Sequence, residues 1–368
     1  MKQSEDKLSF MQTSIMVSGT MIGSGILTLP RSAALTDSPS GWIIILIEGA
    51  VYIGLVLLFM PFLLKNSEKT IYELNRDIMG RVLGSLLNVF ISFYFILTIC
   101  FQARFLGEVT NYFLLKNTPM GVVVFIFLAV GLYHVTGGVY PIAKVYAYIF
   151  PITVIILFVL LMFSLRLFKL DFIRPIMEGG YKSFFDLFPK TLIYFSGLEV
   201  IIYLVPFMKN PKQAKKAVAF GIGSSTLFYS ITLFIVIGCM TIAEAKTGTW
   251  PTISLIHALE IQGIFIERFD IFLLVMWTCQ QFTCMLGSFK GAHLGLNTLF
   301  RLKNKNNVWL LTGLLAVTFG FSMYPEDINS VFEYGTMLGY MFFAVIMIPF
   351  LIWFSSWMKK IFRRKQTS

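Results

Sequence analysis

Long apolar runs recur along the whole chain, and they constrain its fold more than any other feature. A helix needs about 20 apolar residues to cross the hydrocarbon core of a bilayer. Charged residues make up only 13% of the chain, against about 25% in soluble domains. The sequence therefore predicts an all-α integral membrane protein. Its ten expected transmembrane helices lie at about 10–35, 41–64, 83–108, 119–138, 142–165, 188–208, 217–241, 269–290, 308–324 and 334–358.

The segments between these runs are too short for a soluble domain, so 1–368 is expected to form a single polytopic membrane domain. If the spans alternate, 20 of the 30 Lys and Arg residues lie on the side of the N-terminus. Because cytoplasmic loops are enriched in Lys and Arg, this bias predicts that both termini are cytoplasmic. Residues 359–368 then form a basic cytoplasmic tail. Lys144 and Lys290 are interpreted as further cytoplasmic anchors, and the first run as an uncleaved helix.

The net charge of +11 does not indicate a nucleic-acid-binding protein, because the basic residues lie in short loops between apolar runs. The four cysteines lack metal-ligand spacing and are interpreted as small buried hydrophobic residues. The sequence contains no grouping of nucleophile, histidine and acid, and no phosphate-binding glycine loop. We therefore expect a non-enzyme with no metal and no cofactor.

Two apolar runs contain glycine where a continuous helix has no use for it. The first reads GTMIGSGILTLP, from Gly19 to Pro30, and the sixth reads YFSGLEVIIYLVP, ending at Pro206. Their Ser-Gly pairs, Ser24-Gly25 and Ser196-Gly197, are 172 residues apart, and each opens a block of five spans. Because five is odd, the blocks must be inverted relative to each other. Transporters built this way often have corresponding helices broken near the midplane, so we predict a five-plus-five inverted repeat, with repeats at about 8–168 and 185–358.

A helix break in lipid leaves backbone groups without partners, and it is tolerated where it lines a cavity. The free amides that start the outer half-helix suit a carboxylate, whereas the carbonyls that end the inner half-helix suit an ammonium or a metal cation. A zwitterionic ligand carries both charges. The alternative is that Gly19 and Gly23 form a GxxxG packing face. The predicted ligand-binding residues are Gly19, Thr20, Gly23, Ser24, Gly25, Ile26, Phe195, Ser196, Gly197 and Glu199.

Several ionisable residues lie within predicted spans, where a charge is costly and usually functional. Glu199 follows the second break, either as a ligand or coupling carboxylate or as a partner for backbone groups that the break frees. Arg104 and Glu108 are four residues apart on one helix face. They form either an intrahelical pair or, with Glu48 as a third partner, a set of gating charges that line a cavity.

Two motifs resemble the amino acid–polyamine–cation permease superfamily. GTMIGSGIL is similar to the motif of its first helix, and Phe195-Ser-Gly-Leu-Glu199 followed by Lys209-Asn-Pro-Lys212 is similar to its sixth helix and the next loop. The resemblance implies a LeuT-like fold over essentially the whole chain. In sodium-coupled relatives, hydroxyls of helix 8 and carbonyls of helix 1 hold a cation, which makes Thr283 and Ser288 a candidate cation site. The alternative for these hydroxyls is helix–helix hydrogen bonding.

The length and the IGSGILTLP start most resemble the B subunits of GerA-type germinant receptors of spore-forming bacilli. This resemblance implies a nutrient sensor in the inner spore membrane that binds an amino acid or sugar. Its implied partners are an A subunit and a lipoprotein C subunit, together with the lipid bilayer and without nucleic acid. Two alternatives remain open, namely a proton- or cation-coupled amino acid permease and a regulated water or ion pore.

Overall fold

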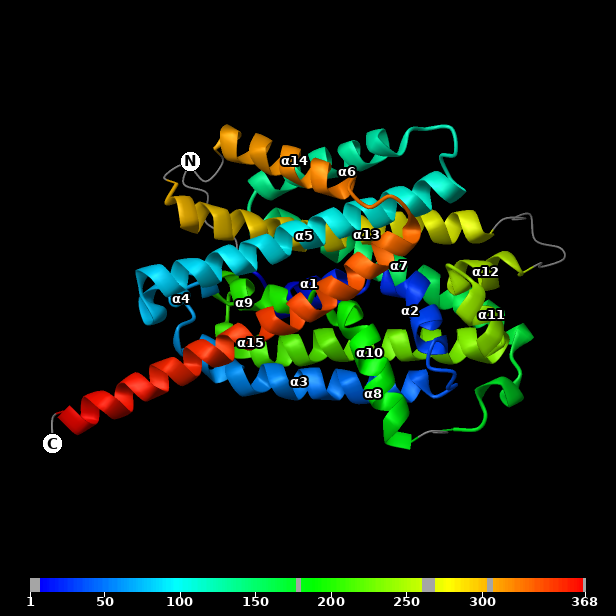
Figure 1. Cartoon of the computed structure of the whole chain (residues 1–368), viewed down its shortest axis with the longest axis horizontal. Coiled ribbons are helices and arrows are strands. Elements are labelled where there is room, and N and C mark those ends of the chain that lie inside the picture. The colour runs from blue at the N-terminus through cyan, green and yellow to red at the C-terminus, as the bar shows by residue number, and fades with distance from the viewer. Residues whose placement is uncertain (1–6, 177–179, 260–268, 303–306, 367–368) are drawn as a thin grey trace.

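A computed structural model describes residues 7–176, 180–259, 269–302 and 307–366, and the chain is nearly all helical (Figure 1). In the following, η marks a 3₁₀ helix. The described helices are α1 (Phe10–Met21), α2 (Gly25–Ala34), α3 (Gly41–Lys65), α4 (Ile71–Met79), α5 (Arg81–Phe113), α6 (Met120–Thr136), α7 (Val139–Ser164), η1 (Leu165–Leu167), η2 (Leu170–Ile173), α8 (Gly180–Thr191), η3 (Leu192–Phe195), η4 (Leu198–Val200), α9 (Ile201–Leu204), η5 (Val205–Phe207), η6 (Pro211–Gln213), α10 (Ala214–Cys239), α11 (Ile242–Thr247), α12 (Pro251–His257), α13 (Phe269–Phe300), α14 (Val308–Ser322) and α15 (Ile328–Gln366).

The helices are those of a multi-pass membrane protein. In the described part of the chain, six helices are long and apolar enough to cross a bilayer. Two bent helix pairs raise the number to eight if each pair is counted as one span. The helices α6 and α14 lie where the fourth and ninth spans are expected, but they are shorter, at 17 and 15 residues. At 1.5 Å per residue, such helices fall short of a hydrocarbon core about 30 Å thick. The number of ten spans therefore stays a prediction.

The sixth predicted span begins earlier than expected. Its first half is helical over Tyr181–Phe195, whereas the apolar run suggests a start near residue 188. Lys182 and Asp186 lie on this early part of α8 and lower its hydropathy. A search for long apolar runs therefore misses the beginning of this helix. The segment between the seventh and eighth predicted spans contains the short helices α11 and α12, and 260–268 lies outside the described residues.

The first broken span lies in the middle of the bundle. In Figure 1, α1 runs between a layer that contains α5 and α13 and a layer that contains α3 and α10, and it contacts both α10 and α13. Its last six residues, 16–21, are all buried. A helix that is buried on all sides belongs to the core rather than to the lipid-facing surface, so whatever α1 binds is enclosed by protein.

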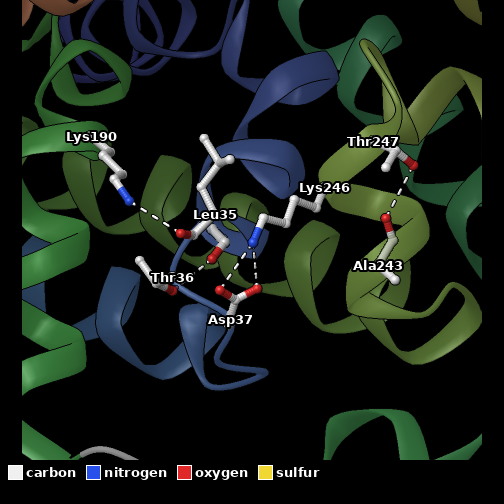
Figure 2. Close-up of polar contacts among 8 residues, drawn as sticks. Leu35, Thr36, Asp37, Lys190, Ala243, Lys246 and Thr247 are labelled. Atoms are coloured by element: carbon white, nitrogen blue, oxygen red, sulfur yellow. Dashed lines mark hydrogen bonds and ion pairs between the residues drawn. The ribbon is translucent and has the colours of Figure 1, made fainter.

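The two broken spans run in opposite directions. At one end, the Leu8 amide just before α1 donates to the Phe207 carbonyl at the end of η5, at 2.8 Å. At the other end, Lys190 of α8 donates to the Leu35 carbonyl just after α2, at 3.3 Å. Figure 2 shows this contact beside the ion pair of Lys246 with Asp37 (2.8 Å), which joins α11 to the same end of the first span. An inverted repeat requires such an antiparallel course, although the repeat boundaries stay a prediction.

Candidate functional site

The first break lies where the glycines predict it. The helix α1 ends at Met21, α2 begins at Gly25, and their axes differ by 52°. Ile22 leaves the helical conformation with φ −78° and ψ 94°. A Cβ atom at Gly23 would lie 2.9 Å from both the Cys284 Sγ and the Gln281 Oε1, so α13 approaches the break closely. The glycines thus create the break and also let α13 pack against it.

Side chains of neighbouring helices satisfy the carbonyls around this break. The Nε2 of Gln280 donates to the carbonyls of Gly19 (2.8 Å) and Ile22 (2.9 Å). The Tyr229 hydroxyl donates to the Met21 carbonyl at 2.6 Å, and the Trp277 Nε1 donates to the Gly23 carbonyl at 3.1 Å. Sequence reasoning leaves these carbonyls free for an ammonium or a cation. In the structure, protein donors occupy them.

Two amides of the same break are open. In the described part of the chain, the N–H groups of Ser24 and Gly25 donate to no acceptor, whereas the Gly23 N–H faces the Tyr229 hydroxyl. They lie at the N-terminus of α2, where the helix dipole favours a negative group. The break therefore offers a ligand its amide end, because its carbonyl end is already capped.

The second break, between η3 and η4, bends its span by 51°. Gly197 has φ +113°, a left-handed conformation that favours glycine. The Glu199 carboxylate accepts from the Gly197 amide (2.6 Å) and from the Tyr94 hydroxyl (2.8 Å). Both carboxylate oxygens of this buried residue thus accept hydrogen bonds at the break. This geometry corresponds to the second interpretation of Glu199, as a partner for backbone groups that the break frees. The two breaks meet, because a Cβ at Gly197 would lie 2.5 Å from the backbone of Thr20.

A small cavity of about 20 Å³ lies between the two breaks, which is room for roughly one water molecule. Its lining is uncharged and consists of Thr20, Met21, Gly23, Ser24, Thr98, Phe101, Gln102, Ile193, Tyr194, Ser196, Gln281 and Cys284. Among the described residues, the Oε1 atoms of Gln102 and Gln281 are buried and have no donor. The cavity therefore combines open amide donors with two unpartnered amide oxygens.

A larger cavity of about 310 Å³ adjoins the first on the α2 side. Four residues line both cavities and form the wall between them, namely Ser24, Phe101, Ile193 and Tyr194. The Tyr194 hydroxyl is fixed by a 2.6 Å hydrogen bond to the Ser32 Oγ of α2. A ligand larger than water reaches the inner cavity only if this wall moves.

Four of the predicted ligand-binding residues line the inner cavity, namely Thr20, Gly23, Ser24 and Ser196. The others lie around it in packing or capping positions. Gly19 contacts Tyr146, Gly25 contacts Tyr229, and Phe195 stacks on Tyr52 with ring centroids 4.6 Å apart. The carbonyl of Ile26 accepts a 2.6 Å hydrogen bond from Thr252 of α12.

The predicted gating charges lie away from the lining of the inner cavity. Arg104 and Glu108 form the expected intrahelical pair at 2.8 Å, and Arg104 also donates to the Glu326 carbonyl at 3.4 Å. Glu48 of α3 is buried and accepts from the Thr191 hydroxyl at 2.9 Å, next to the start of η3. This geometry favours the intrahelical alternative for the pair.

Replacing Glu108 by glutamine is expected to lower the free energy of unfolding by roughly 1–3 kcal/mol, because the buried Arg104 guanidinium loses its counter-ion. Thermal denaturation of the detergent-purified protein measures the change. Glu326→Gln is the matched control, since only its backbone carbonyl contacts Arg104. Equal melting temperatures for the two variants would contradict the prediction.

The candidate cation site on α13 is arranged differently from the expectation. The Thr283 hydroxyl donates to the Gln280 carbonyl of its own helix at 2.7 Å, and Ser288 is buried. It is Gln280 and Cys284, one turn apart, that face the α1 carbonyls. Lys290, interpreted above as a cytoplasmic anchor, is buried and lies 3.5 Å from the Val135 carbonyl, whereas Lys144 is exposed.

Comparisons with known proteins assign the family. A family model described as "Spore germination protein" matches residues 7–331. Spore germination protein B2 of Bacillus subtilis is 69% identical over 366 residues, which cover 100% of both chains. The chain belongs to the spore germination protein family. Spore germination protein A2 of the same organism is 33% identical over 96% of each chain.

Solved structures show the fold of this spore germination protein. Mhp1, a nucleobase-cation-symport-1 family transporter, matches with a TM-score of 0.64 at 16% identity, covering 91% of this chain and 75% of its own. MhsT in complex with L-phenylalanine matches with a TM-score of 0.62 at 12% identity, covering 94% and 98%. The fold is LeuT-like, as the resemblance implies, with its first and sixth spans broken. Family and fold together indicate a membrane protein that is not an enzyme.

Proposed function

We propose that this spore germination protein is the nutrient-sensing membrane subunit of a germinant receptor in the inner spore membrane. It would bind a small nutrient, an amino acid rather than a sugar, between the two breaks. An A subunit and a lipoprotein C subunit would read the resulting change of shape, with both termini of this chain in the cytoplasm.

One observation carries this proposal, namely the pairing of donors and acceptors around the inner cavity. The open amides of Ser24 and Gly25 suit a carboxylate, and the unpartnered oxygens of Gln102 and Gln281 suit an ammonium. An unpaired buried polar group costs about 1–3 kcal/mol. A zwitterion would recover that cost, because its carboxylate pairs with the open amides and its ammonium with the two amide oxygens. A neutral sugar carries neither of the charges that these two groups favour.

The closed state of the cavity fits a sensor. A volume of about 20 Å³ excludes an amino acid, so binding requires displacement of the wall formed by Phe101, Ile193 and Tyr194. A ligand shifts such an equilibrium by its differential affinity for the two states. Binding would therefore be linked to a change of shape that partner subunits detect.

Gln281→Leu is expected to raise the amino-acid concentration needed for half-maximal germination roughly tenfold or more, since a charge-assisted hydrogen bond contributes about 1.5–3 kcal/mol. Spores that carry the variant together with its natural partners are titrated with amino acids. Thr318→Val is the control, because that buried hydroxyl bonds within α14 at 2.8 Å and does not line the cavity. An unchanged dose response for Gln281→Leu would reject this binding site.

The LeuT-like fold also supports a second candidate, a coupled amino acid permease, and a regulated pore is a third. Uptake of labelled amino acids and of ions into proteoliposomes separates them from the sensor. Strong coupled uptake by the isolated chain would reject the sensor in favour of the permease, and ligand-gated ion flux would favour the pore.

A further inference from the structure

The side-chain amide of Gln280 contacts carbonyls of the kind that coordinate a coupling cation in ion-driven transporters. In such transporters, carbonyls of unwound backbone and of half-helix C-termini coordinate Na⁺ or a proton site. Here the carbonyls of Gly19 and Ile22 converge on the Gln280 Nε2, at 2.8 and 2.9 Å. The same two oxygens lie 3.0 and 3.1 Å from the Cys284 Sγ.

The chemistry of these contacts fixes the orientation of the amide. A primary amide has two N–H donors, and each can serve one of the two carbonyls. The flipped orientation would place Oε1 against both oxygens, which repel it. Gln280 is fully buried, so no water competes for these hydrogen bonds. The amide thus places partial positive charge at the carbonyls where a bound cation would place a full charge.

We propose that the Gln280 amide permanently replaces a coupling cation, with the Cys284 thiol beside it. The end of α1 is then satisfied by the chain itself, so neither binding at the break nor the accompanying change of shape draws on an ion gradient. This proposal rests on the proposed function in one respect, namely that the nutrient binds at the same helix break. A sensor of this design reports the nutrient concentration, whereas an ion-coupled one would also report the membrane potential.

The test measures melting temperature and amino-acid binding of the purified full-length protein in NaCl and in choline chloride at equal ionic strength. The wild type is expected to give the same values in both salts. Gln280→Glu replaces the Nε2 group, with its two donors, by a carboxylate oxygen that faces two carbonyls, and Na⁺ or a proton would relieve the repulsion. Its melting temperature is expected to rise by roughly 4 °C on addition of Na⁺, and also on lowering the pH.

Thr283→Ala is the matched control, because the Thr283 hydroxyl donates to a carbonyl of its own helix. This variant is expected to show no response to Na⁺. Should Gln280→Glu not accumulate, Gln280→Ser takes its place, since it leaves room and an oxygen ligand for Na⁺, and the same rise is expected. A Na⁺-dependent wild type, or a Gln280 variant without a Na⁺ response, would overturn the proposal. A wild type that binds no amino acid, with a Na⁺-responsive Gln280 variant, would refute the proposed function and leave this inference intact.

Discussion

Replacing Gly197 by alanine is expected to destabilise the protein so strongly that little of it accumulates in the membrane. The new Cβ would lie 2.5 Å from the carbonyl carbon and oxygen of Thr20 and 2.6 Å from the Met21 nitrogen. These are backbone atoms of the other broken span, so no flexible side chain can move aside. In addition, Gly197 has φ +113°, which other residues rarely adopt. We expect a loss of about 3–5 kcal/mol in the free energy of unfolding.

Immunoblotting of spore membranes and the melting temperature of any purified protein measure this effect. Gly54→Ala in α3 and Gly320→Ala in α14 are matched controls, because a Cβ at either position meets nothing within 4 Å. Both controls are expected to accumulate normally. If Gly197→Ala accumulates and melts like them, the two breaks do not touch as described.

Replacing Gly25 by alanine is expected to weaken the nutrient response strongly while the protein persists. The new methyl group would lie 2.6 Å from the Tyr229 hydroxyl and 3.0 Å from the Tyr194 ring, at the position of an open amide. Tyr229 would have to give up its 2.6 Å hydrogen bond to the Met21 carbonyl. Both neighbours are side chains that can shift, so the chain still folds, but the amide end of the break becomes covered.

A dose response of spore germination, normalised to the amount of protein, measures the effect of Gly25→Ala. We expect the half-maximal concentration to rise roughly 100-fold, which corresponds to about 2.8 kcal/mol of binding free energy. Gly54→Ala again serves as the control for adding a methyl group within a span. A normal response of Gly25→Ala spores would show that the ligand does not use these amides.

The breaks are predictable from the sequence because they depend on local backbone chemistry. Ser24-Gly25 and Ser196-Gly197 stand out in apolar runs, and an odd number of spans between them requires inversion. The same reasoning fails for α8, whose early turns carry charge, and it leaves α6 and α14 open because their helices are short. The local sequence pattern therefore predicts the position of a helix break better than the residue at which a transmembrane span begins.

The partners of the breaks are not predictable in this way, because they depend on which helix faces meet. Thr283 is the natural sequence candidate for contacts with α1, yet its hydroxyl bonds its own helix, as threonine hydroxyls in helices often do. Gln280 and Cys284 make those contacts instead. The adjacent Gln280-Gln281 pair in an apolar helix is the one available signal. Glu199 stands out in the sequence as a charge beside the second break, but its two hydrogen bonds cannot be predicted without the position of Tyr94.

The unequal capping of the first break has a mechanical consequence. The α1 end is held by hydrogen bonds from Tyr229 of α10 and Gln280 of α13. The helix α2 is held by hydrogen bonds of Ile26 with Thr252 and of Ser32 with Tyr194, and the segment after it by the exposed Lys246–Asp37 pair. Exposed ion pairs of this kind contribute only about 0.2–1 kcal/mol. A ligand that moves α2 relative to α1 would therefore have to break the two hydrogen bonds of α2 as well as this weak pair. A partner that contacts α11 would be placed to detect such a movement through the exposed Lys246–Asp37 pair.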